Sequence, residues 1–226
     1  MLSEQDKEFL YKTLSFWDNL KEEEKNLILN TTVSVKYEKG DILHNGMNEC
    51  VGVLLVKKGT LRTYILSEEG KEVTLYRLTN GDCCILSASC ILKDITFDVS
   101  IDAQSDCEIL VMKVSVFEQL MKKNVYVENF SYKVTAERFS DVMWAMEQIL
   151  FLRFDQRLAI FLLDESKKQG SDKITMTHEM IAKYLGSARE VVSRMLKYFA
   201  NENMVEVTRG TIEIKDKKKL KELLES

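Results

Sequence analysis

The 226-residue chain contains no proline and only two histidines. The absence of proline excludes a proline-rich linker, so any domain boundary has to fall within ordinary secondary structure. Two histidines leave few side chains that could act as general bases near neutral pH. A phosphate-binding glycine loop, a Gly-x-Ser-x-Gly motif and a His-Glu-x-x-His motif are also missing. The sequence therefore gives no support for an enzyme.

Long apolar runs are absent as well. No stretch approaches the roughly 20 apolar residues of a membrane-spanning helix, and residues 1–7 are polar, unlike the start of a signal peptide. We therefore expect a cytoplasmic protein with no membrane partner. Its five cysteines, an odd number, argue against a disulfide framework.

Residues 177–197 have the pattern of two short helices joined by a tight turn. Thr177 is a good N-cap for the first helix, and Gly186 is expected to end it. Apolar residues recur between them at spacings of three and four, as one buried helix face requires. These are Met180, Ile181, Tyr184 and Leu185.

Ser187 is expected to cap the start of the second helix, because Ser187 and Glu190 form a Ser-x-x-Glu capping box. Its predicted inner stripe comprises Val191, Met195, Leu196 and Phe199. The opposite face carries Arg189, Glu190, Ser193, Arg194 and Lys197. Any surface helix can carry charges, but arginine bonds guanine in two places and glutamate accepts from the cytosine amine. The pattern is typical of a DNA-reading helix-turn-helix.

The downstream sequence supports this interpretation. Residues 205–207 and 211–214 alternate apolar with polar side chains and flank Thr208, Arg209 and Gly210, which predicts a hairpin wing. Residues 153–226 hold 15 Lys or Arg against 12 Asp or Glu, whereas residues 1–152 hold 17 against 24. The basic excess thus coincides with the predicted winged helix, as binding to DNA phosphates requires.

The segment Arg189-Glu190-Val191-Val192-Ser193-Arg194 resembles the recognition helix of CRP/FNR-type transcription regulators. The resemblance implies that Arg189, Glu190 and Arg194 contact a G·C-containing core of each DNA half-site, with Ser193 refining the choice beside it. Arg189 resembles the cyclic-AMP receptor branch and Ser193 the FNR branch. It also implies double-stranded DNA with two-fold-related half-sites and RNA polymerase as partners. Further predicted DNA contacts are Thr177, His178, Ser187, Lys197 and Arg209.

Residues 1–30 are expected to form a short helical lead-in. From about 31 to 113 the apolar period changes to two, and glycines separate strand-like runs at 51–56, 60–66, 73–78, 97–101 and 109–113. Short strands at this spacing predict an all-β roll or jelly roll. In the CRP/FNR family this is the effector-sensing, cyclic-nucleotide-binding-like domain. The expected fold class is therefore α+β, with a sensing roll at 1–124, a dimerisation helix at 125–153 and a winged helix-turn-helix at 154–226.

A long helix is predicted from about 126 to 152, and a further one from 155 to 168. The first has apolar residues at spacings of three and four, which can form an intrachain core stripe or pack against a second helix. The resemblance favours pairing with the same helix of a second copy, which places two recognition helices on two half-sites. The stripe comprises Phe139, Val142, Met143, Met146, Ile149 and Leu150.

The effector is not identified by the sequence. Cyclic-nucleotide-binding members of the family use a Gly-Glu pair and an Arg-Ser or Arg-Thr pair, but this chain has no arginine between Arg77 and Arg138. We therefore expect no classical cyclic-AMP binding. The corresponding stretch instead contains Cys83, Cys84 and Cys90, which suit thiol-based redox sensing, ligation of a metal or cluster, or plain apolar packing.

A third alternative is a planar ligand such as haem, lined by His44, Met143, Trp144 and Met146. Taken together, the sequence predicts a homodimeric transcription regulator that couples a small-molecule or redox signal to DNA binding. The alternative is a ligand-sensing module whose C-terminal helices bind a protein rather than DNA. The charged face from Arg189 to Arg194 favours DNA, since a protein-docking helix would not need it.

Overall fold

The computed structural model describes residues 2–45, 51–85 and 99–225. Internal contacts divide the chain into two compact units. The first comprises Met1–Leu66 and Leu75–Val142, and the second comprises Ser67–Thr74 and Met143–Ser226. Each unit has its own hydrophobic core, and each is described by itself below.

The first unit opens with helix α1 (Glu4–Thr13), the short 3-10 helix η1 (Trp17–Asn19) and helix α2 (Glu22–Thr31). A reciprocal capping box starts α1, because the Ser3 hydroxyl accepts from the Asp6 amide and the Asp6 carboxylate accepts from the Ser3 amide. The lead-in predicted for residues 1–30 is thus helical. It contributes apolar side chains to the core, including Leu10, Leu14, Phe16, Trp17 and Ile28.

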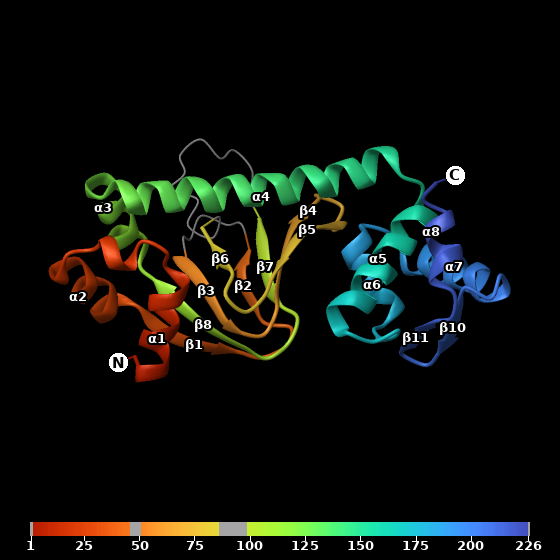
Figure 1. Cartoon of the computed structure of the whole chain (residues 1–226). Helices are drawn as coiled ribbons and strands as arrows, with labels where there is room; N and C mark the ends of the chain where they lie inside the picture. The colour runs from red at the N-terminus through yellow and green to blue at the C-terminus, as the bar shows by residue number, and fades with distance from the viewer. Residues whose placement is uncertain (1, 46–50, 86–98, 226) are drawn as a thin grey trace. The chain divides into compact units, whose positions relative to one another are not determined.

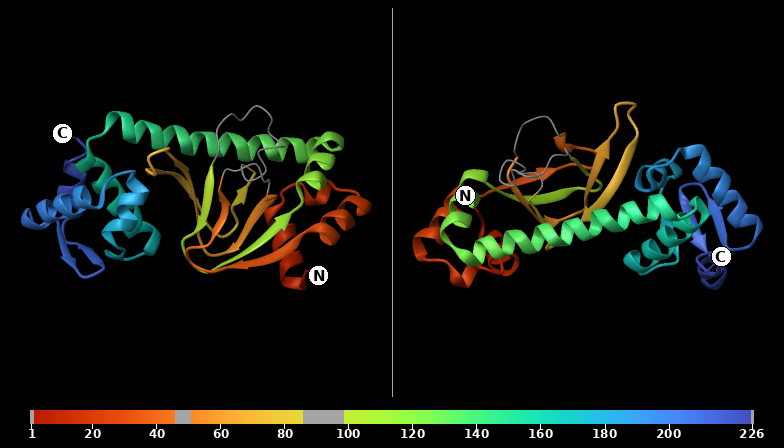
Figure 2. Two further views of the ribbon diagram at one scale, coloured as in Figure 1. Left: turned by 180° about the vertical axis from the view of Figure 1, so that it is seen from behind. Right: turned by 90° about the horizontal axis from the view of Figure 1, so that it is seen from above.

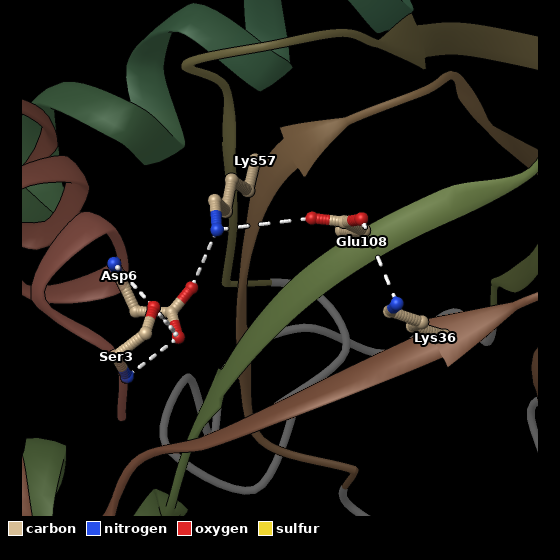
Figure 3. A network of polar contacts seen from close by, with 5 residues as sticks. All are labelled: Ser3, Asp6, Lys36, Lys57 and Glu108. Carbon is tan, nitrogen blue, oxygen red and sulfur yellow. Dashed lines mark hydrogen bonds and ion pairs between the residues drawn. The ribbon is translucent and has the colours of Figure 1, made fainter. Parts of the chain in front are cut away.

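An ionic network fastens α1 to the neighbouring sheet (Figure 3). The Lys57 Nζ atom lies 2.7 Å from Asp6 Oδ1 and 3.7 Å from Glu108 Oε2. The other carboxylate oxygen of Glu108, Oε1, lies 4.0 Å from Lys36 Nζ. Burial raises the pKa of Asp6, but hydrogen bonds from Lys57 and Ser3 outweigh it and hold the pKa below its ordinary value of 3.8. The network therefore stabilises the docked position of α1 with a charged carboxylate.

Two four-stranded antiparallel sheets form the roll (Figure 1). The first has the strand order β1-β8-β3-β6 and the second β2-β7-β4-β5. The bounds of the first sheet are β1 Val33–Tyr37, β8 Cys107–Met112, β3 Val53–Lys58 and β6 Cys83–Cys84. Those of the second are β2 Ile42–Asn45, β7 Ser100–Ala103, β4 Leu61–Leu66 and β5 Glu72–Leu78.

Alternation along β3 shows how the sheets are packed. Leu54 and Val56 face the core between the two sheets, whereas Val53 and Leu55 face a second core beneath the N-terminal helices. The predicted β-roll is therefore confirmed. The strand predicted at 97–101 is found as β7 from Ser100, while positions 97 and 98 lie outside the described residues.

Two helices follow the roll. Helix α3 (Val114–Lys123) and the first part of α4 (Val125–Phe151) pack on the core beneath the sheets through residues such as Phe117, Val127 and Phe130. Both views of Figure 2 show the first part of α4 lying beside the strands of the roll. No helix in the described ranges is both long and apolar enough to cross a membrane.

The second unit contains the predicted winged helix. In chain order it is built from α5 (Phe154–Gln169), β9 (Lys173–Thr175), α6 (His178–Leu185), α7 (Arg189–Asn201), β10 (Val205–Thr208), β11 (Thr211–Ile214) and α8 (Lys217–Glu222). The strands form one sheet in the order β10-β11-β9. Its core draws on every helix, with Leu158, Phe161, Ile181, Leu196, Phe199 and Leu220 buried.

Candidate nucleic-acid interface

Local sequence sets the ends of α6 as expected. The Thr177 hydroxyl accepts a hydrogen bond from the Met180 amide at 3.2 Å, which caps the helix at its start. Gly186 ends it in the left-handed conformation with φ of +57°. The guanidinium of Arg157 on α5 donates a hydrogen bond to the carbonyl of Leu185, so α5 holds the last turn of α6 in place.

Helix α7 begins one residue later than predicted. Its N-cap is Ala188, which has no side-chain cap, and the capping box expected between Ser187 and Glu190 is therefore wrong. The reason lies in the preceding turn, where the Ser187 amide bonds the carbonyl of Ala182 at 2.9 Å and so belongs to the C-terminal cap of α6. Ser187 is half-buried, and its role as a DNA contact stays a prediction.

The buried face of α7 differs from the predicted stripe by one position. Val192, Leu196 and Phe199 are fully buried, whereas Val191 and Met195 are only half-buried. The one-residue shift of the helix start does not alter this face, since side-chain direction follows from the helical period. Val192 was missed because two adjacent valines satisfy the apolar pattern equally well.

The opposite face of α7 is exposed. Arg189, Glu190, Arg194 and Lys197 all lie in the solvent-exposed class. None of the four makes an ion pair or a side-chain hydrogen bond with the residues that the structure describes. Four charged side chains that form no ion pair or side-chain hydrogen bond with the described residues are therefore available for an outside partner.

Ser193 and His178 are brought together by the packing of α6 on α7. The His178 Nδ1 atom lies 2.8 Å from the Ser193 hydroxyl oxygen, and both side chains are half-buried. Burial and the nearby positive charge of Arg189 lower the pKa of His178 below its ordinary value of 6.5. The neutral imidazole is thus the main form at neutral pH.

The wing is the hairpin of β10 and β11, drawn in blue in Figure 1. Val205 pairs with Ile214 and Thr208 with Thr211, so the hairpin turns at Arg209 and Gly210 as the alternation predicted. Arg209 is exposed at this turn. It is therefore positioned, like the exposed residues of α7, to meet a partner from solvent.

Two of the candidate redox cysteines are buried. Cys83 and Cys84 form β6, and they face opposite sides of the sheet, one toward each core. Neither is in a disulfide. Burial and the neighbouring Cys84 raise the pKa of the Cys83 thiol far above its usual range, which suppresses the reactive thiolate. Cys90 lies outside the described residues.

The residues considered for haem do not gain support. His44 is buried on β2 and already interacts with another group of the protein. Met143, Trp144 and Met146 on α4 are each about half exposed. Within ranges 2–45, 51–85 and 99–225 the structure also contains no group of three His, Cys, Asp or Glu side chains arranged to hold a metal ion.

A polar group inside the roll was not anticipated from the sequence. The hydroxyls of Thr63 on β4 and Tyr76 on β5 are buried, and so is Nε of Arg138 on α4. None of these three atoms has a well-aligned hydrogen-bond partner among the described residues, although the Tyr76 hydroxyl lies near the side chains of Thr63 and Cys84. The Arg138 guanidinium lies 5.1 Å from the centre of the Tyr76 ring and 3.8 Å from Asp82. Burial raises the pKa of Tyr76 well above its usual value, so its hydroxyl stays protonated.

Comparisons with known proteins agree with this architecture. Residues 156–223 match the Crp-like helix-turn-helix domain, and residues 34–124 match the cyclic nucleotide-binding domain. A solved structure from Eubacterium rectale, described as a transcriptional regulator of the Crp/Fnr family, is 45% identical. It superposes with a TM-score of 0.90 over 95% of this chain and 100% of that chain. The chain belongs to the CRP/FNR family.

Characterised relatives are more distant. The fumarate and nitrate reduction regulatory protein of Yersinia pestis is 25% identical over 82% of this chain and 76% of its own length. The cAMP-activated global transcriptional regulator CRP of Salmonella typhimurium is 25% identical over 77% of this chain and 85% of its own. As a member of this family, the chain is a DNA-binding transcription regulator rather than an enzyme.

Proposed function

We propose that the chain works as a cytoplasmic homodimer whose two α7 helices read two-fold-related DNA half-sites, under the control of an effector held in the roll. The observation that carries this proposal is the exposed face of α7. Its four charged side chains make no ion pair among the described residues, yet they surround Ser193 at the centre of the face. Side chains kept free in this way can bond base edges and phosphates on contact with DNA.

Within this proposal the residues have different roles. Arg189, Glu190, Ser193 and Arg194 contact base edges in the major groove. The remaining predicted contacts, which lie around this face and in the wing, position the protein on the phosphates. These are Thr177, Ser187, Lys197 and Arg209; the fifth, His178, bonds the Ser193 hydroxyl and is considered below.

The proposed dimer interface is an apolar seam along α4. Tyr132, Phe139, Met143, Met146 and Leu150 follow one another at spacings of seven, four, three and four, which is the spacing of a coiled-coil seam. All five side chains are exposed. The face of α4 that packs on the roll, with Val127, Phe130 and Val134, points elsewhere around the helix. Of the predicted stripe, Ile149 is exposed beside the seam, and Val142 is half-buried against the roll core.

The proposed effector is a small polar molecule rather than a thiol oxidant. Thr63, Tyr76 and Arg138 supply buried hydrogen-bonding atoms inside the roll that the described residues leave without well-aligned partners. Unpaired buried polar atoms are costly, and a polar ligand would satisfy them. Because Arg138 lies on α4, a ligand bound there would act directly on the helix that carries the seam. A change in α4 would then couple effector binding to DNA affinity. RNA polymerase is the expected partner at the promoter.

The test of the DNA-reading role is a fluorescence-anisotropy titration of short duplexes at several salt concentrations. The wild type is expected to prefer its own site over scrambled DNA, and log affinity should fall linearly with log salt. Arg194→Ala should lower the affinity for the specific site by about 5- to 150-fold per half-site and leave scrambled DNA much less affected.

The matched control is Lys221→Ala, which removes an exposed cation from α8 in the same unit. It should change neither affinity by more than about 2-fold. Equal affinity of the wild type for specific and scrambled DNA would refute the proposal.

A further inference from the structure

The Ser193 hydroxyl lies at the centre of the exposed face of α7. Arg189 precedes it by one helical turn and Lys197 follows it by one turn. A hydroxyl inside a helix commonly bonds the carbonyl four residues earlier. Thr31 and Thr135 do so in this chain, at 2.6 and 2.8 Å. Ser193 instead bonds the imidazole of His178 on the neighbouring helix.

This bond engages His178 within the protein. The residue is the first of α6, fifteen positions before Ser193, so the contact exists only because α6 packs on α7. The ring is half-buried, and one of its two nitrogens is already used. The bond therefore fixes the ring of His178 against the Ser193 hydroxyl.

The hydrogen-bond partner of a hydroxyl determines whether that hydroxyl can donate to, or only accept from, a second group. When the Ser193 proton is donated to Nδ1, the oxygen presents only lone pairs, which suit the amines of cytosine or adenine. When Nδ1 carries a proton and donates it, the Ser193 proton is released. It then suits an acceptor such as guanine O6 or thymine O4. The same serine can thus favour opposite classes of base.

We propose that His178 is a positioning residue that makes Ser193 a hydrogen-bond acceptor toward DNA and so sets the base preference opposite Ser193. This rests on the proposed function, in which Ser193 contacts a base. In this role His178 acts through Ser193 rather than through a phosphate. Its role is to accept the hydrogen bond of the Ser193 hydroxyl, which contacts the base.

The state of the ring supports this assignment. Arg189 is the charged group that acts on it from α7, and on α6 the next titratable residue is Glu179. Burial and Arg189 keep the imidazole neutral at neutral pH, because both lower its pKa. The more stable neutral tautomer carries its proton on Nε2, which leaves Nδ1 free to accept from Ser193. Acidification to below this pKa reverses the direction of the bond.

The experiment measures binding of full-length protein to four duplexes that differ only in the base pair opposite Ser193. That position is located first, as the one where Ser193→Ala removes discrimination. At pH 7.5 the wild type should prefer a cytosine or adenine amine in the read strand by about 2- to 10-fold. As the pH is lowered through the pKa of His178, the preference should shift toward guanine or thymine.

Three variants complete the test. His178→Ala should erase the preference at this one base pair while leaving the salt dependence unchanged. His178→Asn places a hydrogen-bonding atom near the position of Nδ1 but cannot gain a proton, so it should remove the pH shift. Lys197→Ala is the comparison for a phosphate contact, which should weaken all four duplexes equally and lower the salt slope by about one.

Two outcomes would overturn the inference. If His178→Ala behaves as Lys197→Ala does, His178 is a phosphate ligand and the positioning role is wrong. If Ser193→Ala alters the discrimination among the four base pairs but His178→Ala does not, Ser193 contacts its base without being positioned by His178. A different failure, no effect of Ser193→Ala at any position, would refute the proposed base contact of Ser193 itself.

Discussion

Removing Phe139 should weaken the proposed dimer strongly. The Phe139 residue is 65% exposed in the single chain and lies in the middle of the apolar seam. A phenylalanine side chain buries roughly 200 Å² when enclosed, so pairing would remove about 130 Å² of Phe139 from water in each copy. At about 25 cal/mol per Å² this is worth about 3 kcal/mol per copy and about 6 kcal/mol per dimer.

Incomplete burial and side-chain ordering reduce this figure. If about half of this free energy is realised, Phe139→Ala weakens the dimer by about 3 kcal/mol. This loss raises the dissociation constant about 100-fold. Sedimentation-velocity ultracentrifugation over a concentration series of Phe139→Ala measures the shift. Circular dichroism should show unchanged helix content, since Phe139 makes no contribution to either core of the first unit.

Trp144→Ala provides the matched control. Trp144 is 51% exposed on the same helix, but it lies about 140° around the helix from Phe139 and therefore off the seam. Its replacement should leave the dissociation constant within about 3-fold of the wild type. An unchanged constant in Phe139→Ala, or an equal loss in both variants, would refute the seam.

Three further predictions concern the roll and the helices packed on it. Gly59→Ala should lower the free energy of unfolding by more than about 2 kcal/mol, because φ is +96° and a Cβ would lie 2.5 Å from a cysteine sulfur. Gly70→Ala, with φ of +80° but nothing within 4 Å, should cost about 1 kcal/mol in the same urea titration. The Asp6 pKa is lowered, so its ion pair with Lys57 stabilises the fold above pH 3.8 and is lost as the pH falls through the lower folded value. Asp6→Asn should therefore narrow the stability difference between pH 7 and pH 3, and an unchanged difference would count against the network. Cys83 should react with a maleimide only on unfolding, because burial raises its thiol pKa, and rapid labelling of native protein in a mass spectrum would revive redox sensing.

The regular parts of the fold were predictable because they depend on local patterns. Alternating apolar residues and the glycines between them indicated the strands of the roll, and Thr177 and Gly186 correctly marked the ends of α6. The wing followed from the alternation on either side of Arg209 and Gly210. In each of these cases the signal lies within a few consecutive residues.

Other features depend on neighbours that are distant in sequence. The start of α7 moved because the turn before it used the amide of Ser187. The bond between His178 and Ser193 forms only when two helices pack, so neither residue alone indicates it. The polar group of Thr63, Tyr76 and Arg138 likewise joins two strands and a helix, which no sequence spacing brings together.

The central claim is that two copies of α7 read one two-fold-related DNA site. Selection of bound sequences from a random duplex library by the full-length protein tests it most directly. The expected result is one enriched motif with two inverted half-sites centred about 10 base pairs apart, with G·C pairs in the core of each half-site. Recovery of no motif, or of a single unpaired half-site, would contradict the claim.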